Sequence, residues 1–333
     1  MSGKIFEKEL RRCKFGIELE LCSCILGYSK GRDCISFQKY FAADLQSKMN
    51  SSKSVSKEQV DYIEDEEKTP LDYTHWSVVE DTSLGCNTGT EDTPDSYKYH
   101  KYKLERARTS GLENDKLLGD CGQEFCALEL VSRVLRFTEL DVLHNVYKLL
   151  FDARTIYEVN DSQGLHITVS HPNLDPEQLI ELWVYYEEAI RELLLKEERR
   201  SKESTKYAMP IRDVFVSGKS EHGITRGVVG IRDWKKWYYT EPTKTGKYSA
   251  MNIKRVPGQK EYMAEFRIAG STLQWEEIYG WIELFCRMVT LSVINQNPNR
   301  RLGNLLSQLH SSFLSDAMAG IVMKGFPKDA DVK

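Results

Sequence analysis

An alternating run near the N-terminus, KFGIELEL from Lys14 to Leu21, constrains the fold of this chain more than any other segment. Side chains of an extended strand alternate between its two faces. The phenylalanine, isoleucine and leucine side chains therefore share one face, and Glu18 and Glu20 share the other. The run predicts a strand with one face in the core and one acidic face. An edge strand that meets water also has this pattern, so other segments must show whether the acids have a chemical role.

Four further segments predict strands that carry charged or polar side chains on one face. In GLHITVS, His166 alternates with apolar residues, and Glu129 does so in CALELVS. In EYMAEFRIAG, Glu265 and Arg267 share a face. Asp81 ends the strand in HWSVVED, just before a turn. Each of these residues taken singly also fits an ordinary role as a solvated, hydrogen-bonded or ion-paired strand residue.

Taken together, these groups favour a cation and an anionic ligand. Clustered carboxylates repel one another and raise one another's pKa unless positive charge neutralises them. Magnesium supplies such charge, because it prefers oxygen ligands and binds between a few carboxylates and substrate phosphates. The pattern therefore predicts Mg²⁺ together with ATP.

Helical periodicity separates the predicted strands. Apolar residues recur at helical spacing after Thr138 and Asp141, which offer an N-cap arrangement, and again in a long helix that Asp175 caps with Pro176 at its first position. A further long helix follows in STLQWEEIYGWIELFCRMVTLSVI, and LGNLLSQLHSSFLSDAMAGIVM adds C-terminal helical material. Strands with polar faces among long helices predict an α+β protein, in which helices back one side of a mainly antiparallel sheet.

The length of 333 residues suits one large domain or two smaller ones, and we expect a single domain over residues 1–333. Two polar segments, at about 28–70 and 85–120, are expected to be mobile insertions, and the second is a candidate lid. A formal net charge of −4 gives no reason to expect nucleic acid or a membrane as a partner. The charged start and the lack of a long apolar run predict a soluble cytoplasmic protein. Eight scattered cysteines predict reduced thiols.

Several common site motifs fail or are absent. SGKS at residues 217–220 looks like the end of a phosphate-binding P-loop, but Asp213 stands where the first glycine is required. The sequence contains no GxGxxG, GxSxG or HExxH motif. Cys22, Cys24 and Cys34 lack a fourth ligand at the spacing of a zinc site.

Six motifs in chain order resemble the amidoligase family, which lies within the superfamily of glutamine synthetase and glutamate-cysteine ligase. They run from about Phe15 to Val289 and so cover most of the chain. The motifs are FGIELE, W-x-V-V-x-D-x-S-L, ELVS, GLHITV, KY-x-x-x-N and EFRIAGSTL. Six ordered motifs are far more specific than FGIELE alone.

The resemblance implies ATP-dependent joining of a small-molecule or peptide carboxylate to an amine through an acyl phosphate. It implies a curved antiparallel sheet whose concave face holds Mg-ATP. By motif, the implied metal ligands are Glu18, Glu20, Asp81, Glu129 and Glu265. The implied nucleotide contacts are His166, Arg267 and Lys247. The implied catalytic residues are Glu129, His166 and Arg267.

The chain departs from the family pattern at three positions. Thr168 stands where many members have a second histidine, Thr82 where glycine is common, and Arg133 where proline is common. The two polar segments have no clear counterpart in the family, so we expect them to influence the choice of substrate. Two other functions stay open on the sequence: a binding module of the same fold without turnover, and a guanidino or amino phosphotransferase.

Overall fold

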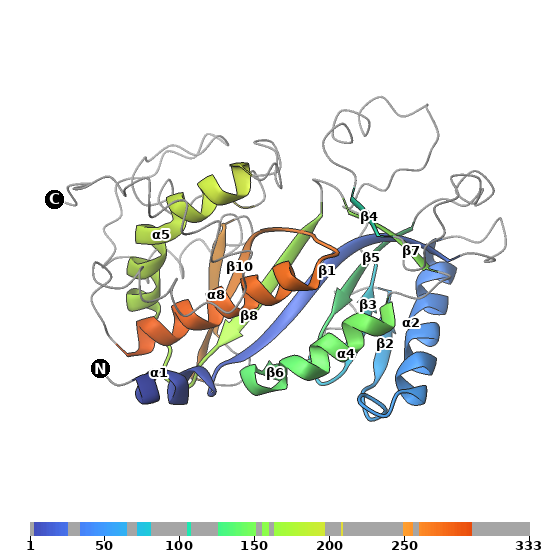
Figure 1. The fold of residues 1–333 in the computed structure, drawn as a ribbon, viewed down its shortest axis with the longest axis horizontal. Helices are drawn as coiled ribbons and strands as arrows, with labels where there is room; N and C mark the ends of the chain where they lie inside the picture. The colour runs from blue at the N-terminus through green and yellow to red at the C-terminus, as the bar shows by residue number, and fades with distance from the viewer. Residues whose placement is uncertain are drawn as a thin grey trace. The chain divides into compact units, whose positions relative to one another are not determined.

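The computed structural model describes residues 3–25, 34–64, 72–80, 105–107, 126–150, 155–159, 163–196, 208, 249–255 and 260–294. These residues form a mixed α and β structure around an open, mostly antiparallel sheet (Figure 1). The strands are β1 (Lys14–Ile25), β2 (Val60–Ile63), β3 (Trp76–Val79), β4 (Glu105–Ala107), β5 (Cys126–Val131), β6 (Leu135–Arg136), β7 (Thr155–Val159), β8 (Gly164–Ser170), β9 (Met251–Arg255) and β10 (Tyr262–Gly270). The helices are α1 (Gly3–Leu10), α2 (Cys34–Ser51), the 3₁₀ turn η1 (Phe137–Glu139), α4 (Leu140–Leu150), α5 (Pro176–Lys196) and α8 (Trp275–Val293).

The main path of the sheet has the strand order β2-β3-β5-β1-β8-β10-β9. The chain divides into two compact units. Unit 1 comprises Met1–Cys13, Ile167–Ala269 and Glu276–Lys333, and unit 2 comprises Lys14–His166 and Gly270–Trp275. No helix among the described residues combines the length and apolar character needed to cross a membrane.

Strand β1 organises unit 2 and has the two faces that its sequence predicts. The side chains of its apolar face are all buried, namely Phe15, Ile17, Leu19 and Leu21. Along its length β1 pairs antiparallel with β5 at residues 18–23, with β6 at residues 14–15 and with β7 at residues 22–25. The predicted strand over this run, with its apolar side chains buried on one face, is therefore confirmed.

Helix α2 and strand β2 lie in the polar segment at about 28–70, for which the sequence predicts no helix or strand. Helix α2 packs against β2, β3, β5 and α4 (Figure 1). Its buried side chains recur every four residues, at Phe37, Phe41, Leu45 and Met49. This spacing places them on one helical face, so the signal is present but is obscured by the Ser/Lys-rich residues that follow.

Arg133 anchors this segment to the sheet. Its guanidinium lies 2.6 Å from one Glu58 oxygen and 3.0 Å from the other, and it also contacts Glu139 at 3.0 Å. The indole of Trp76 donates to Glu58 at 2.9 Å. Burial would raise the pKa of Glu58, but the hydrogen bonds from Arg133 and Trp76 outweigh it, so the pKa lies below its ordinary value. Arg133 therefore forms a charged link between this segment and the sheet.

Arg133→Met is expected to lower the free energy of unfolding by about 1–3 kcal/mol at pH 7, because it removes several charge-assisted hydrogen bonds from partly buried groups. A carboxylate with a lowered pKa in the folded state stabilises the protein above its unfolded pKa, and this contribution is lost as the pH falls through the folded value. The gap between wild type and variant should therefore narrow at acid pH. Urea titrations at pH 7 and pH 4 measure both values, and a gap that widens at pH 4 contradicts the assignment.

Helices α5 and α8 pack with β10 in unit 1 through aromatic rings. Phe266 of β10 stacks on Phe285 of α8 with ring centroids 4.1 Å apart and nearly parallel planes. The ring centroid of Trp183 in α5 lies 5.3 Å from that of Phe266. Helix α5 starts as predicted, because Pro176 is its first residue and the Asp175 carboxylate accepts a hydrogen bond from the backbone N–H of Glu177 at 2.9 Å.

Two local predictions are wrong. Thr138 and Asp141 do not form the start of a helix as expected; η1 precedes α4, and the Glu139 carboxylate accepts from the backbone N–H of Arg136 at 2.9 Å. The reason is that the first turn begins after Arg136 rather than Thr138, and Glu139, three residues further on, satisfies the Arg136 N–H group. Cys22 is disulfide-bonded rather than reduced, whereas Cys13 and Cys286 carry free thiols.

Several expectations concern residues that the structure does not describe. The candidate lid at 85–120 is described only at β4, which pairs with β7. The C-terminal helical material after residue 294 lies outside the described residues, as do Asp81 and Lys247.

Candidate functional site

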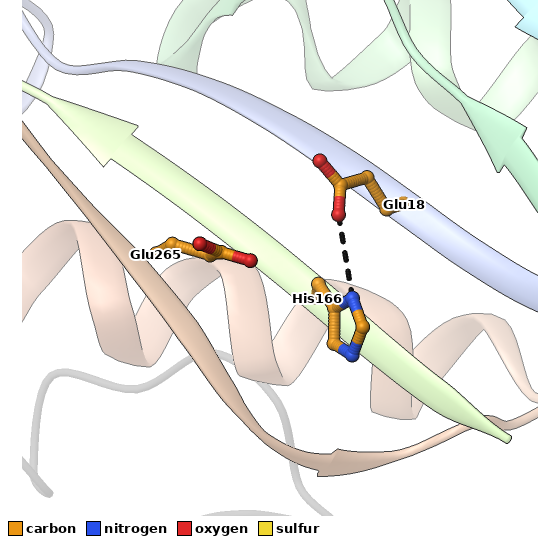
Figure 2. Close-up of side chains that lie close together, drawn as sticks. All are labelled: Glu18, His166 and Glu265. Carbon is orange, nitrogen blue, oxygen red and sulfur yellow. Dashed lines mark hydrogen bonds and ion pairs between the residues drawn. The ribbon is translucent and has the colours of Figure 1, made fainter. Parts of the chain in front are cut away.

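His166 lies between two carboxylates of β1. Its Nδ1 atom is 3.3 Å from Oε2 of Glu18, and its Nε2 atom is 3.5 Å from Oε1 of Glu20 (Figure 2 shows the contact with Glu18). The imidazole is buried, and Glu18 is more exposed than Glu20. A protonated imidazole donates from both nitrogens, whereas a neutral one donates from only one. The position therefore places an imidazole that can donate a hydrogen bond directly between two acids.

Backbone groups hold Glu20 in position. The backbone N–H of Gly164 donates to Oε2 of Glu20, and the Ser271 hydroxyl donates to the Glu20 carbonyl at 2.6 Å. The backbone N–H of Ser271 in turn donates to the carbonyl of Gln163 at 3.1 Å. Because both the carboxylate and the backbone of Glu20 are bound, this acid is fixed more firmly than an edge-strand residue in water.

Glu129 lies beside Glu20 across the sheet. The two residues are direct partners in the antiparallel register of β1 and β5, and Glu129 is also the partner of Val79 in β3. Directly opposite side chains in such a pair project to the same face with Cβ atoms about 5 Å apart. This register therefore brings two acidic side chains to the same face of the sheet.

Glu265 on β10 is surrounded by donors from its own strand and from β9. Its Oε2 atom lies 2.6 Å from Nζ of Lys254 and 3.3 Å from Nδ2 of Asn252. Its Oε1 atom lies 2.5 Å from Nη1 of Arg267. The carboxylate is buried, and Asn252 is its direct partner in the register of β9 and β10. Glu265 and Arg267 share a face, as their alternation predicts.

One ligand atom each from Glu18, His166 and Glu265 lies within 4.8 Å of the other two (Figure 2). Two carboxylate oxygens and an imidazole nitrogen are donors that hard and borderline divalent cations accept, with Mg²⁺ favouring the oxygens and Mn²⁺ accepting both types. The residues present therefore fit a divalent metal. These three come from β1, β8 and β10, which are far apart in the sequence.

Residues 11–289 match the family described as "Putative amidoligase enzyme". The chain belongs to this amidoligase family. Every site residue described above lies inside the matched range, and membership indicates an enzyme with a ligase-type function. No curated protein matches the chain.

Within this member of the family, the structure brings together part of the set of site residues predicted from the sequence. His166 contacts both Glu18 and Glu20, and Arg267 contacts Glu265. His166, for which the family motif implies a nucleotide phosphate, contacts acids. Asp81 and Lys247 lie outside the described residues.

Sequence reasoning missed two residues of this candidate site. Lys254 contacts Glu265, and Ser271 holds the backbone of Glu20. Lys254 shares a strand face with Asn252 in MNIKR, and Ser271 follows directly after the EFRIAG segment, so both are adjacent to residues that the sequence singles out. Only the side-chain contacts in the folded chain show that Lys254 reaches the Glu265 carboxylate and Ser271 the Glu20 backbone.

Proposed function

We propose that this chain is a carboxylate–amine ligase that uses ATP and Mg²⁺ to form an amide or isopeptide bond through an acyl phosphate. One observation carries the proposal: Glu18, His166 and Glu265 offer three ligand atoms within 4.8 Å of one another in a chain of the amidoligase family. The carboxylate substrate is a small molecule or a peptide, and the amine is its partner in condensation. The enzyme is proposed to act in the cytoplasm.

Glu18, His166 and Glu265 would hold one divalent cation, and Glu20 and Glu129, which are direct partners across β1 and β5, would offer carboxylate oxygens to a second one. Mg²⁺ would supply charge neutralisation for the nucleotide phosphates and for the acids. The open antiparallel sheet is compatible with a glutamine synthetase-like fold, in which a curved sheet carries these groups on its concave face and long helices back the other. Acids drawn from several strands then face one substrate.

The chain's own residues provide the remaining chemistry in this proposal. The substrate carboxylate attacks the γ-phosphorus of ATP, the bond to the bridging oxygen breaks, and ADP leaves. Arg267 offsets the charge on the transferred oxygens. The amine then attacks the acyl carbon and inorganic phosphate leaves, while Glu129 accepts the proton that the amine must lose. Exclusion of water from the acyl phosphate prevents its hydrolysis.

A condensation screen tests the proposal. Purified full-length protein is incubated with ATP, Mg²⁺ and pooled carboxylates and amines, and ADP release and new product masses are followed together. We expect ADP in equal amount to a product whose mass is the sum of two substrates minus water, and no product when EDTA removes the cation. A stable phosphoramidate with ADP would identify a phosphotransferase instead. Nucleotide binding without any product across a broad screen would favour a binding module.

A further inference from the structure

Lys254 is a cation at the site with no role in the proposed reaction. It lies on β9 next to Asn252 on the same strand face, while Met251 and Ile253 on the other face are buried. Its ammonium is 2.6 Å from Oε2 of Glu265, yet half of its side chain is exposed. A long, half-exposed lysine therefore reaches a carboxylate that is only 5% exposed.

Both oxygens of Glu265 are engaged by cations of the protein itself. Lys254 contacts one oxygen and Arg267 the other, so two positive charges face one negative charge. A metal that uses Glu265 as a ligand brings two further positive charges onto oxygens that these cations already contact, so it competes with them electrostatically. Arg267 is on the same strand as Glu265 and is only 16% exposed, which confines it. Lys254 is the more exposed of the two, and exposed ion pairs are weak, so it is the contact that yields more readily.

We propose that Lys254 is a placeholder cation, which occupies Glu265 when no divalent metal is bound and turns to the anionic phosphoryl groups when metal and nucleotide arrive. This inference rests on the proposed metal site. Displacement by a doubly charged cation leaves the ammonium without its carboxylate and repelled by the metal. Phosphate oxygens are then its strongest partners, because lysine binds phosphate as a compact, flexible point charge.

The placeholder role predicts effects of opposite sign on metal and on nucleotide. Lys254→Met removes a competitor for Glu265, so Mn²⁺ should bind about two- to tenfold more tightly in the absence of nucleotide. The same variant lacks a phosphate contact, so ATP should bind about tenfold more weakly at saturating Mn²⁺. A merely structural role would not strengthen one ligand and weaken the other.

Titration calorimetry with Mn²⁺ and then with ATP measures both affinities in the full chain. Arg255→Met is the matched control, because Arg255 is the exposed neighbour on β9, belongs to the opposite strand face and lies near Tyr262. It removes the same charge without touching Glu265 and should change neither affinity. Lys254→Arg keeps a cation within reach and should stay near wild type for Mn²⁺.

Two outcomes overturn the inference and can be told apart. Equal Mn²⁺ affinities for wild type, Lys254→Met and Arg255→Met would refute the placeholder role but leave the metal site and the ligase proposal standing. No Mn²⁺ binding to wild type would remove the metal site itself, and with it both proposals. Circular dichroism of each variant confirms that the compared proteins are folded.

Discussion

Glu265→Gln is expected to abolish nucleotide-dependent ligation and to lower the free energy of unfolding. A neutral amide at this position leaves Lys254 and Arg267 without the buried carboxylate that both contact. Removing one partner of a buried ion pair costs about 3–5 kcal/mol, and the half-exposed Lys254 places the cost near the lower end. Loss of a proposed metal ligand should lower turnover by more than about a hundredfold, which is the upper range for residues that only support such ligands.

Glu18→Gln separates the two effects. Glu18 is 22% exposed, and the one side-chain contact described for it is with His166. Its loss should therefore change the free energy of unfolding by only about 1 kcal/mol. Turnover should nevertheless fall as far as in Glu265→Gln. Urea unfolding and ATP-coupled condensation measure the two quantities, with Glu261→Gln just before β10 as the control. Wild-type turnover in Glu18→Gln would show that Glu18 does not take part in the reaction.

Phe285→Ala is expected to lower the free energy of unfolding by about 3–5 kcal/mol. Phe285 is fully buried, stacks on Phe266 and lies 5.5 Å from Trp281 between ring centroids. Truncation removes this ring and leaves a cavity that rigid aromatic neighbours cannot fill. Denaturant unfolding at pH 7 measures the effect.

Val134→Ala is the control for this substitution, because Val134 is exposed and its truncation should change stability by no more than about 0.5 kcal/mol. A cost below about 1 kcal/mol for Phe285→Ala would show that the aromatic cluster is not the core of unit 1. Phe266 lies between Glu265 and Arg267 in β10, so a disordered stack should also weaken divalent-cation binding. Mn²⁺ titration of the folded variant measures that second effect.

The parts of this molecule that the sequence predicts are those in which one strand face is buried. Phe15, Ile17 and Leu19 alternate with acids, and burial of the apolar set determines where Glu18 and Glu20 project. The same reasoning places Glu265 and Arg267 on one face of β10. Period-two alternation is a local property, so one sequence suffices to find it.

The contacts between strands could not be predicted in this way. Glu20 faces Glu129, and Asn252 faces Glu265, only because of the register in which their strands pair. Register depends on the whole sheet and leaves no mark on either strand alone. Lys254 was missed for this reason, since an exposed lysine near a strand end has nothing in its local sequence to distinguish it.

The central place of β1 also bears on how such an enzyme could change its substrate. This one strand pairs with β5, β6 and β7 and carries both Glu18 and Glu20, so a shift of its backbone would break several ladders at once. The segment with α2 instead meets the sheet at one edge, through helix packing, the pairing of β2 with β3 and the contact of Arg133 with Glu58. Replacement of that segment by one of different length would thus change the edge of the sheet, while Glu18 and Glu20 stay in place on β1. Substrate specificity could then change without any change in the acids of the candidate site.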